Sequence, residues 1–379
     1  MGVSTITTIN LLAKLQEVPD VRRRQGRLYP LASVLGMLIL AALNGESSLR
    51  GMLGWGERHW QELARPLEFK GGTSAPVYGT VWRILHLLPL AALESVLGAW
   101  LATGEVKDEA ALALDGKQLR GSKRRESGLP ALQVVTAAAQ GLGVVLGQEL
   151  AEHQDDVAAL LALLERLPIQ GKVVTLDAGL LTREVAQTIL EKGGAYLGLL
   201  KGNHGEVTTA VAYWLEVQLG TAPPDYVEMD KRHGRVEKRE YWWTASAELE
   251  AYLAQEYGWE GVRLCGRVRR QRRPLTADEW TASEEYVVVY GSRGSHLPTA
   301  PQCSQWLREH WSIENRVFWV LDVTYGEDRN PARGIGVALS KLRCISLNVI
   351  RRLGYRYVPD GHRAAAALPD RGLAWLRSV

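Results

Sequence analysis

The sequence predicts an α/β protein with a mixed sheet, preceded by a helical N-terminal region and interrupted by a β-rich insertion. Three observations support this prediction. Apolar residues recur at helical spacing from residue 30 to about residue 103. After Gly104, short apolar runs typical of strands alternate with amphipathic helical stretches, which is the pattern of an α/β domain. Between residues 226 and 293 the chain is rich in β-branched and aromatic residues, and helical spacing then resumes.

The N-terminal region is expected to be helical throughout. Its apolar spacing predicts helices over residues 30–43, 47–63, 77–88 and 90–101. Ser74-Ala75-Pro76 is the expected start of the third helix, with the proline in its first turn. Short helices joined by tight turns, one of them basic, suit two structures equally well. One is a helix-turn-helix that docks in a nucleic-acid groove, and the other is a helical cap on the rest of the protein.

The core is predicted from the order of its elements after Gly104. Three strands come first, followed by a helix, a strand, a helix, a strand and a last helix. In chain order these are residues 111–115, 132–139, 143–151, 155–167, 172–176, 182–192, 195–200 and 206–218. Gly141 and Gly143 indicate a tight hairpin connection, and Thr182 is the expected cap of the second helix. This is the order of elements in an RNase H-like core, in which the first strand is central and the fourth lies beside it.

Pro223 and Pro224 end this pattern and begin the insertion. Strands are predicted at residues 236–244, 262–268 and 286–290. Helix resumes near Gln302 and continues past Glu314, a further helix covers residues 334–353, and the chain beyond residue 359 carries little signal. We therefore expect a helical, DNA-binding N-terminal domain, the core in two parts separated by the insertion, and a tail. These are residues 1–104, 105–222, 223–298, 299–354 and 355–379.

The composition indicates a soluble globular protein of two or three domains, because 46% of the 379 residues are hydrophobic and 23% are charged. The three cysteines lack metal-ligand spacing, which favours reduced thiols in the cytosol and excludes a zinc cluster. The apolar run at residues 29–43 is shorter than a membrane span and is expected to be a buried helix.

The net charge of +3 is mild, but the positive residues are clustered. The clusters lie at residues 22–27, 117–125, 231–239 and 267–273. A single basic run is usually solvated surface. Four of them together favour a polyanionic partner, most simply nucleic acid.

Two aspartates each follow an apolar run that is predicted to be a buried strand. Asp115 ends the stretch Ala-Leu-Ala-Leu-Asp-Gly-Lys, and Asp177 ends Val-Val-Thr-Leu-Asp-Ala-Gly. At a strand end the backbone reaches the surface, so each carboxylate can face a cleft while partly desolvated. Either aspartate alone is weak evidence for a site.

Glu314 adds a third carboxylate in an unusual position. On a helix that turns 100° per residue, Leu307, Val317 and other apolar residues fall within about 60° of it, so it should lie on the buried face. Burying a carboxylate costs several kcal/mol unless it is paired or binds a cation. A structural salt bridge to Lys117 or Arg120 explains Glu314 alone equally well. With two strand-end aspartates, a shared metal site is the better explanation.

The residue types indicate which metal such a site would hold. Oxygen-only ligands suit Mg²⁺, with Mn²⁺ as a possible substitute. Two such ions about 4 Å apart can activate a nucleophile on one side of a phosphate and stabilise the leaving oxygen on the other. We therefore expect two ions held by Asp115, Asp177 and Glu314, acting on phosphodiester bonds.

Four motifs carry a resemblance to a known family. They are Ala-Leu-Asp115-Gly-Lys-Gln-Leu-Arg-Gly-Ser, Val-Thr-Leu-Asp177-Ala, Leu-Leu-Lys201-Gly-Asn203 and His310-Trp-Ser-Ile-Glu314-Asn. Together they resemble the DDE transposases of bacterial insertion sequences, in particular the subgroup that includes the H-repeat-associated proteins. Residues 18–31 resemble the helical domain associated with that subgroup, and residues 233–239, beginning at His233, also resemble the family.

The resemblance implies an RNase H-like core with a β-rich insertion ahead of the glutamate helix, and cut-and-join chemistry at transposon ends. It also implies that Asp115, Asp177 and Glu314 are the metal triad. Related transposases carry Tyr, Arg and Lys around the glutamate where this chain has Leu307, His310 and Leu321. Their phosphate and end-base contacts therefore cannot be transferred. The expected DNA-binding residues are Arg22, Arg23, Arg24, Lys117, Arg120, Lys201, Arg235, Arg239, Arg308 and His310.

Three functions fit these observations. The first is a metal-dependent DNA transposase that acts on double-stranded DNA at transposon ends and target, as a homodimer on paired ends. It is expected in the bacterial cytoplasm, associated with the nucleoid and without a membrane anchor. The second is a domesticated DNA-binding protein that no longer transposes, and the third is a nuclease that nicks without joining. The complete carboxylate set favours an active enzyme over the second.

Overall fold

The computed structural model describes residues 10–70, 73–101, 106, 108–124, 126–232, 234–368 and 370–378. The chain folds into two compact units. Unit 1 comprises Met1–Glu109, Gly116–Leu167 and Ser312–Val379, and unit 2 comprises Ala110–Asp115 and Pro168–Trp311. The predicted domain boundary at residues 104 and 105 lies outside the described residues, as does His233.

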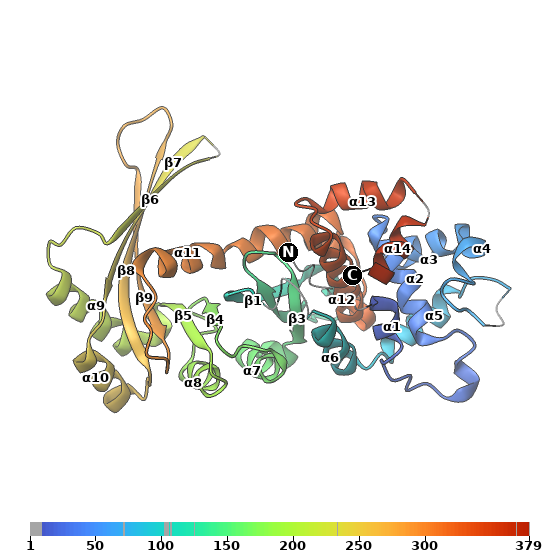
Figure 1. Ribbon diagram of the computed structural model, residues 1–379, viewed down its shortest axis with the longest axis horizontal. Coiled ribbons are helices and arrows are strands. Elements are labelled where there is room, and N and C mark those ends of the chain that lie inside the picture. The colour runs from blue at the N-terminus through green and yellow to red at the C-terminus, as the bar shows by residue number, and fades with distance from the viewer. Residues whose placement is uncertain are drawn as a thin grey trace, which may run out of the picture. The chain divides into compact units, whose positions relative to one another are not determined.

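Unit 2 is built on a mixed sheet, which confirms the predicted α/β class. Its strands, in spatial order, are β1 (Ala111–Leu119), β4 (Val173–Leu176), β5 (Ala195–Leu200), β9 (Ala282–Gly291), β8 (Val262–Pro274), β7 (Arg235–Thr244) and β6 (Tyr226–Arg232). The first three are parallel and the others are antiparallel, and β6 to β9 form the long ribbon in Figure 1. The three strands predicted in the insertion are present, and β6 is an additional one.

Helices cover the sheet of unit 2. They are α8 (Arg183–Glu191), α9 (Gly205–Leu219), α10 (Ala247–Tyr257) and α11 (Ala300–His310). Helix α11 packs on β4, β5, β6 and β7, whereas α9 and α10 pack on β8. The hydroxyl of Thr182 accepts a hydrogen bond from the Val185 amide, so Thr182 caps α8 as predicted. A capping box at Thr299 starts α11.

Unit 1 contains the end of β1 and the hairpin of β2 (Leu132–Ala139) and β3 (Val145–Leu150). Its helices are α1 (Leu11–Leu15), α2 (Leu31–Leu43), α3 (Leu49–Arg58), α4 (Trp60–Leu63), α5 (Tyr78–His86), α6 (Leu90–Leu101), α7 (Asp156–Arg166), α12 (Gly336–Arg352), α13 (Val358–Ala366) and α14 (Arg371–Ser378). The predicted tight turn joins β2 to β3, with Gly143 at a positive φ of 66°.

Helix α2 is the centre of the helical part of unit 1. Every residue from Leu31 to Leu43 except Ala32 is buried, and the helix packs on α1, α3, α12, α13 and α14. The stretch Arg24–Leu43 is long and apolar enough to cross a membrane, as is the bent pair Tyr78–His86 and Leu90–Leu101 taken as one span. Buried core helices share this length and apolar character, and most of the first stretch is buried inside the protein, as predicted for residues 29–43.

One expectation for the helices of unit 1 was wrong, and one region with a weak signal proved to be helical. Helix α5 starts at Tyr78, so Pro76 precedes it instead of lying in its first turn. The region after residue 359, where the sequence carries little signal, contains most of α13 and all of α14, and α14 packs on α1 and α2. Half of the apolar residues of these two helices are alanines, so the periodic signal is weak.

The buried state of α2 predicts a large difference between two leucine substitutions. Leu38→Ala removes a side chain that is 0% exposed and should destabilise unit 1 by about 2–5 kcal/mol. Leu28→Ala, at a side chain that is 57% exposed, should change stability by less than about 0.5 kcal/mol. Urea-induced unfolding followed by circular dichroism measures both. Equal effects would contradict the central position of α2.

Candidate active site

Asp115 and Asp177 lie at matching positions on neighbouring parallel strands of unit 2. The register pairs Leu114 of β1 with Leu176 of β4, and each aspartate is the next residue. Adjacent strands are about 4.8 Å apart and side chains alternate between faces, so both carboxylates leave the same face of the sheet. Both residues are half-buried. The predicted neighbouring of the first and fourth strands is thus confirmed, and it places the two aspartates side by side.

The loop after Asp177 is held by polar groups that follow β5. The Leu180 amide donates to Asp177 Oδ1 at 3.1 Å. Asn203 Nδ2 donates to the Ala178 carbonyl at 2.6 Å, and the His204 ring nitrogen lies 3.1 Å from the same oxygen. Burial lowers the pKa of His204 against the effect of that hydrogen bond, which favours the neutral ring. Neither Asn203 nor His204 was predicted as a site residue, although Asn203 belongs to one of the four motifs.

His310 is buried beneath this edge of the sheet, with only 3% of its surface exposed. Thr175 Oγ1 donates its one proton to the Leu112 carbonyl at 3.1 Å, so it accepts from His310 Nδ1 at 3.0 Å. Burial lowers the pKa of His310 to about 4, although the Asp177 carboxylate opposes this shift. A buried neutral imidazole joins α11 to β4, and its burial argues against the predicted phosphate contact.

Glu314 belongs to unit 1 and is exposed, so its predicted burial on an apolar face was wrong. The chain is not a regular α-helix here. Residues Glu314–Phe318 (η6) and Val320–Thr324 (η7) form two π-helical turns, with the Trp319 amide bonded to the Glu314 carbonyl. A π-turn closes from residue i to i+5, so rotation by 100° per residue no longer applies. In this segment Val317 is buried and Glu314 faces solvent.

Lys117 is also buried, and its partners are not the predicted one. Its Nζ lies 2.5 Å from Asp322 Oδ1 and 2.8 Å from Glu327 Oε2, all within unit 1. Burial alone lowers the pKa of Lys117, but the attraction of Glu327 and Asp322 outweighs it and raises the pKa, so the ammonium is charged at neutral pH. Lys117 therefore does not pair with Glu314, and it is too enclosed to reach DNA.

The other predicted DNA-binding residues differ in how free their charges are. Arg22 is buried and bonds Asp20, Gly26 and Tyr29 within its own loop, which argues against a phosphate contact. Arg239 and Arg308 are partly buried and form ion pairs with carboxylates of the β-ribbon. The remaining predicted residues are exposed: Arg23, Arg24, Arg120, Lys201 and Arg235. Of these, Arg120 and Arg235 also lie 3.8 Å from carboxylate oxygens of Asp328 and Glu237.

The donor chemistry at Asp115 and Asp177 fits a hard divalent cation. Both residues offer carboxylate oxygens, which Mg²⁺ and Mn²⁺ prefer, and both are partly desolvated. Across the described parts of the chain, no three His, Cys, Asp or Glu side chains form a group able to hold a metal ion. The predicted triad of Asp115, Asp177 and Glu314 therefore does not form such a group in the described structure.

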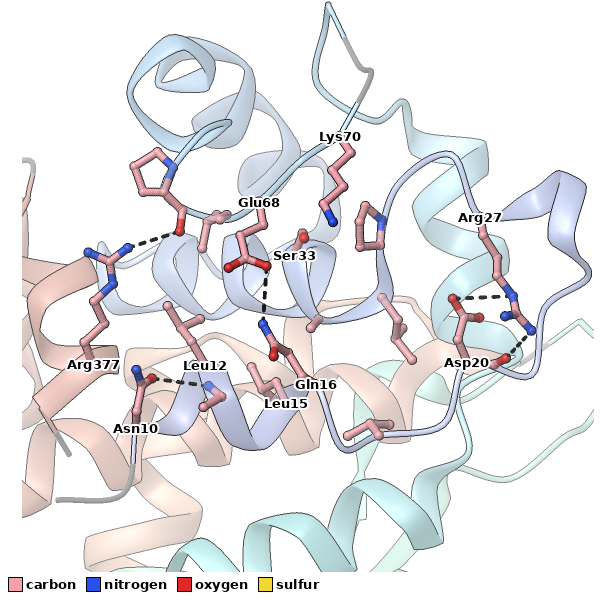
Figure 2. A pocket seen from close by; sticks show the side chains of 17 residues that line it. Asn10, Leu12, Leu15, Gln16, Asp20, Arg27, Ser33, Glu68, Lys70 and Arg377 are labelled. Atoms are coloured by element: carbon pink, nitrogen blue, oxygen red, sulfur yellow. Dashed lines mark hydrogen bonds and ion pairs between the residues drawn. The ribbon is translucent and has the colours of Figure 1, made fainter. Parts of the chain in front are cut away.

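A pocket of about 600 Å³ lies elsewhere, among α1, α2 and α14 of unit 1. Figure 2 shows that polar groups lining it bond one another: Gln16 donates to Glu68, Arg27 to the Asp20 carbonyl and Arg377 to the Pro66 carbonyl. These internal bonds make the pocket part of the fold of unit 1, and we assign it no ligand.

Comparison with known proteins identifies the class. Residues 107–348 match the family model described as Transposase DDE domain, and residues 12–101 match the model described as DDE_Tnp_1-associated. The chain therefore belongs to the DDE transposase family. Membership supports a DNA transposase function and implies DNA as the substrate and a divalent metal cofactor.

Named relatives narrow this to the predicted subgroup. The chain is 27% identical over 347 residues to the H repeat-associated putative transposase YhhI of Escherichia coli K12, covering 90% of each protein. It is 26% identical to the Putative transposase YncI of Escherichia coli O157:H7, covering 90% of this chain and 87% of the relative. A solved piggyBac transposase synaptic complex with hairpin DNA has a TM-score of 0.39 and 9% identity, covering 99% and 83% of the two chains. That likeness is too distant to carry an argument.

His310 predicts a specific loss of stability in acid. Its pKa is about 4 in the folded protein and about 6.5 in an unfolded chain, so the unfolded state binds the proton first. The stabilisation is complete above about pH 6.5 and is lost as the pH falls toward 4, by about 3 kcal/mol at most.

Urea unfolding at several pH values tests this. His310→Asn cannot titrate and should show a shallower decline between pH 7 and 4 than the wild type. His153→Asn is the control, because His153 is exposed and asparagine tolerates its positive φ of 54°. Its profile should match the wild type. Identical profiles for all three proteins would show that His310 is not held neutral.

Proposed function

We propose that this protein cleaves DNA at the ends of an insertion sequence and joins the freed 3′-hydroxyl to target DNA. The observation that carries the proposal is the register of β1 and β4. It sets two half-buried carboxylates, Asp115 and Asp177, side by side where β1 and β4 leave their paired region, within the part of the chain that matches the transposase domain. The strand order β3-β2-β1-β4-β5, with β1 parallel to β4 and β4 to β5, supports an RNase H-like core.

In this proposal Asp115, Asp177 and Glu314 hold two Mg²⁺ ions, which Mn²⁺ can replace. Bound at that position, the ions supply Lewis acidity to a phosphate and lower the pKa of an attacking water or hydroxyl. The aspartates contribute fixed, partly desolvated charge on a rigid sheet. Glu314 contributes a solvent-facing carboxylate from the π-helical segment, which is free to complete the ligand set.

The exposed basic residues are the proposed DNA contacts: Arg23, Arg24, Arg120, Lys201 and Arg235. The helical region of residues 1–104 and the insertion of residues 223–298 would carry most of the sequence-independent affinity. We further propose that the protein acts as a homodimer on paired ends, in the cytoplasm and associated with the nucleoid. No membrane anchor is part of this proposal.

Glu314→Gln should separate chemistry from binding. The variant keeps the shape of an exposed side chain, so the fold and DNA affinity should be retained, while cleavage falls by several orders of magnitude. The assay is cleavage and joining of a labelled DNA fragment that carries the sequences bracketing the gene, with Mg²⁺. Asn315→Ala, at the exposed neighbour, is the control and should cut normally.

Other outcomes of this assay assign the protein differently. If the wild-type protein binds DNA but does not cut it with Mg²⁺, the protein is the domesticated DNA-binding protein. Nicks without joined products identify a nuclease. Normal cleavage by Glu314→Gln removes Glu314 from the ligand set.

The arginines near the N-terminus should differ in their effect on DNA affinity. Neutralising exposed Arg23 and Arg24 should weaken binding and flatten the log-log salt dependence by roughly 0.9 for each phosphate that no longer binds an arginine. Arg22→Gln should destabilise its loop, because Arg22 bonds Asp20 and two carbonyl groups, but it should leave the slope unchanged. Fluorescence anisotropy across a salt series measures the slope. A slope that changes only in Arg22→Gln would reverse the assignment.

A further inference from the structure

The π-helical segment after Glu314 requires an explanation, because two π-turns in succession are rare. They cover Glu314–Phe318 and Val320–Thr324, with Tyr325 N bonded to Val320 O at 3.0 Å. The π-helix is uncommon and usually occurs as a single turn inside an α-helix, frequently at functional sites. A backbone in such a sparsely used geometry persists only when surrounding contacts determine it. Contacts from two sides do so here, all within unit 1.

On one side, Arg316 is held by the turn between β2 and β3. Its Nη1 donates to the carbonyls of Gln140 and Gly141 at 2.8 Å and 2.6 Å. Gly143 allows this approach, because a Cβ added there would lie 3.2 Å from Arg316 Cβ. The first π-turn is therefore fixed to the hairpin two residues after Glu314.

On the other side, Asp322 is held by Lys117 near the end of β1. The Lys117 ammonium is shared between Asp322 and Glu327, and Arg343 of α12 bonds the second oxygen of Glu327 at 3.0 Å. The side chains of Lys117, Glu327 and Arg343 are at most 4% exposed, and that of Asp322 is 30% exposed. Two cations and two anions thus balance in a largely buried cluster that includes the second π-turn.

Backbone contacts reinforce this attachment. Gly121 lies against Asn330 so closely that a Cβ would be 2.4 Å from the Asn330 carbonyl oxygen. The Arg120 amide donates to Asp328 Oδ1 at 3.2 Å. The segment after the π-turns is therefore fixed to the chain that follows β1, by contacts that only glycine permits at position 121.

We propose that Lys117, Asp322 and Arg316 are positioning residues that hold the Glu314 segment in π geometry and thereby direct the Glu314 carboxylate out of the apolar face for metal binding. The proposal rests on the function proposed above for Glu314. Lys117 lies two residues after Asp115, so the same strand that carries one proposed ligand also fixes the segment that carries another. Loss of the Lys117–Asp322 pair releases the second π-turn, and the segment can relax toward an α-helix that rotates Glu314 inward.

Asp322→Asn is the main test, because it removes the charge and keeps the shape. Partners of metal ligands typically contribute 10–100-fold in metal affinity or activity. We expect DNA cleavage to fall by about that factor and the Mg²⁺ concentration for half-maximal rate to rise, with DNA affinity unchanged. Amide hydrogen exchange at residues 314–325 should accelerate in the metal-free protein. Asp322→Glu should restore part of both properties.

Glu94→Gln is the matched control. Glu94 forms another buried ion pair of unit 1, with Lys341, so it reports the general effect of losing such a pair. It should lower thermal stability yet leave the Mg²⁺ dependence and the exchange at residues 314–325 unchanged. Arg316→Gln gives an independent variant on the opposite side, and it should behave like Asp322→Asn even if the latter folds poorly.

The outcomes distinguish this inference from the proposed function. If wild type cuts DNA and Glu314→Gln does not, but Asp322→Asn and Arg316→Gln keep the wild-type Mg²⁺ dependence and exchange rates, the positioning role is wrong. If Glu94→Gln changes the Mg²⁺ dependence and the exchange at residues 314–325 by the same amount, then Lys117 and Asp322 contribute only to general stability. If wild type does not cut, the proposed function fails, and accelerated exchange in Asp322→Asn alone still supports control of the π geometry.

Discussion

The buried ammonium of Lys117 is the interaction on which the arrangement of unit 1 depends. A charge at that depth persists only with close partners, because removing one partner of a buried pair leaves an uncompensated charge and costs about 3–5 kcal/mol. Asp322 and Glu327 provide the partners, and Arg343 balances the second carboxylate. The end of β1, the π-helical segment and α12 therefore meet at one cluster. An apolar contact would tolerate sliding between these elements, whereas directional ion pairs permit one register.

In unit 2 the corresponding constraint is the parallel pairing of β1 with β4. Pairing by register fixes the backbone positions of the two aspartates relative to each other. The loop after Asp177 is then held by Asn203 and His204, which bond the Ala178 carbonyl. Neutral His310 is hydrogen-bonded to Thr175 of β4. The carboxylates thus stand on backbone that several independent hydrogen bonds hold, which is the rigidity that a metal site needs.

Much of the core could be predicted from sequence, and the reasons are physical. The β4 and β5 strands are short apolar runs bounded by turn residues, so their positions follow from composition. The predicted burial of Glu314 was wrong because it was inferred from α-helical rotation, and no periodicity reveals a π-turn. The roles of Lys117 and His310 depend on partners 205 and 135 residues away, which local patterns cannot show. Asp322 lies in an apolar run, Phe-Trp-Val-Leu-Asp-Val. A carboxylate within an apolar run is a signal that could have identified it.

The division of β1 has a consequence for how this protein can be handled. Its first five residues belong to unit 2 and its last four belong to unit 1. The main segment of unit 2, residues 168–311, is preceded and followed in the chain by segments of unit 1. No single cut of the polypeptide yields two complete units. A fragment that begins at residue 168 lacks β1, one of the two strands that pair with β4. One that ends at residue 167 lacks α12 and the partners of Lys117. Proteolysis or truncation should therefore inactivate both units together. During evolution the β-ribbon could be exchanged as one continuous segment, whereas neither unit could, because each is built from separate segments of the chain.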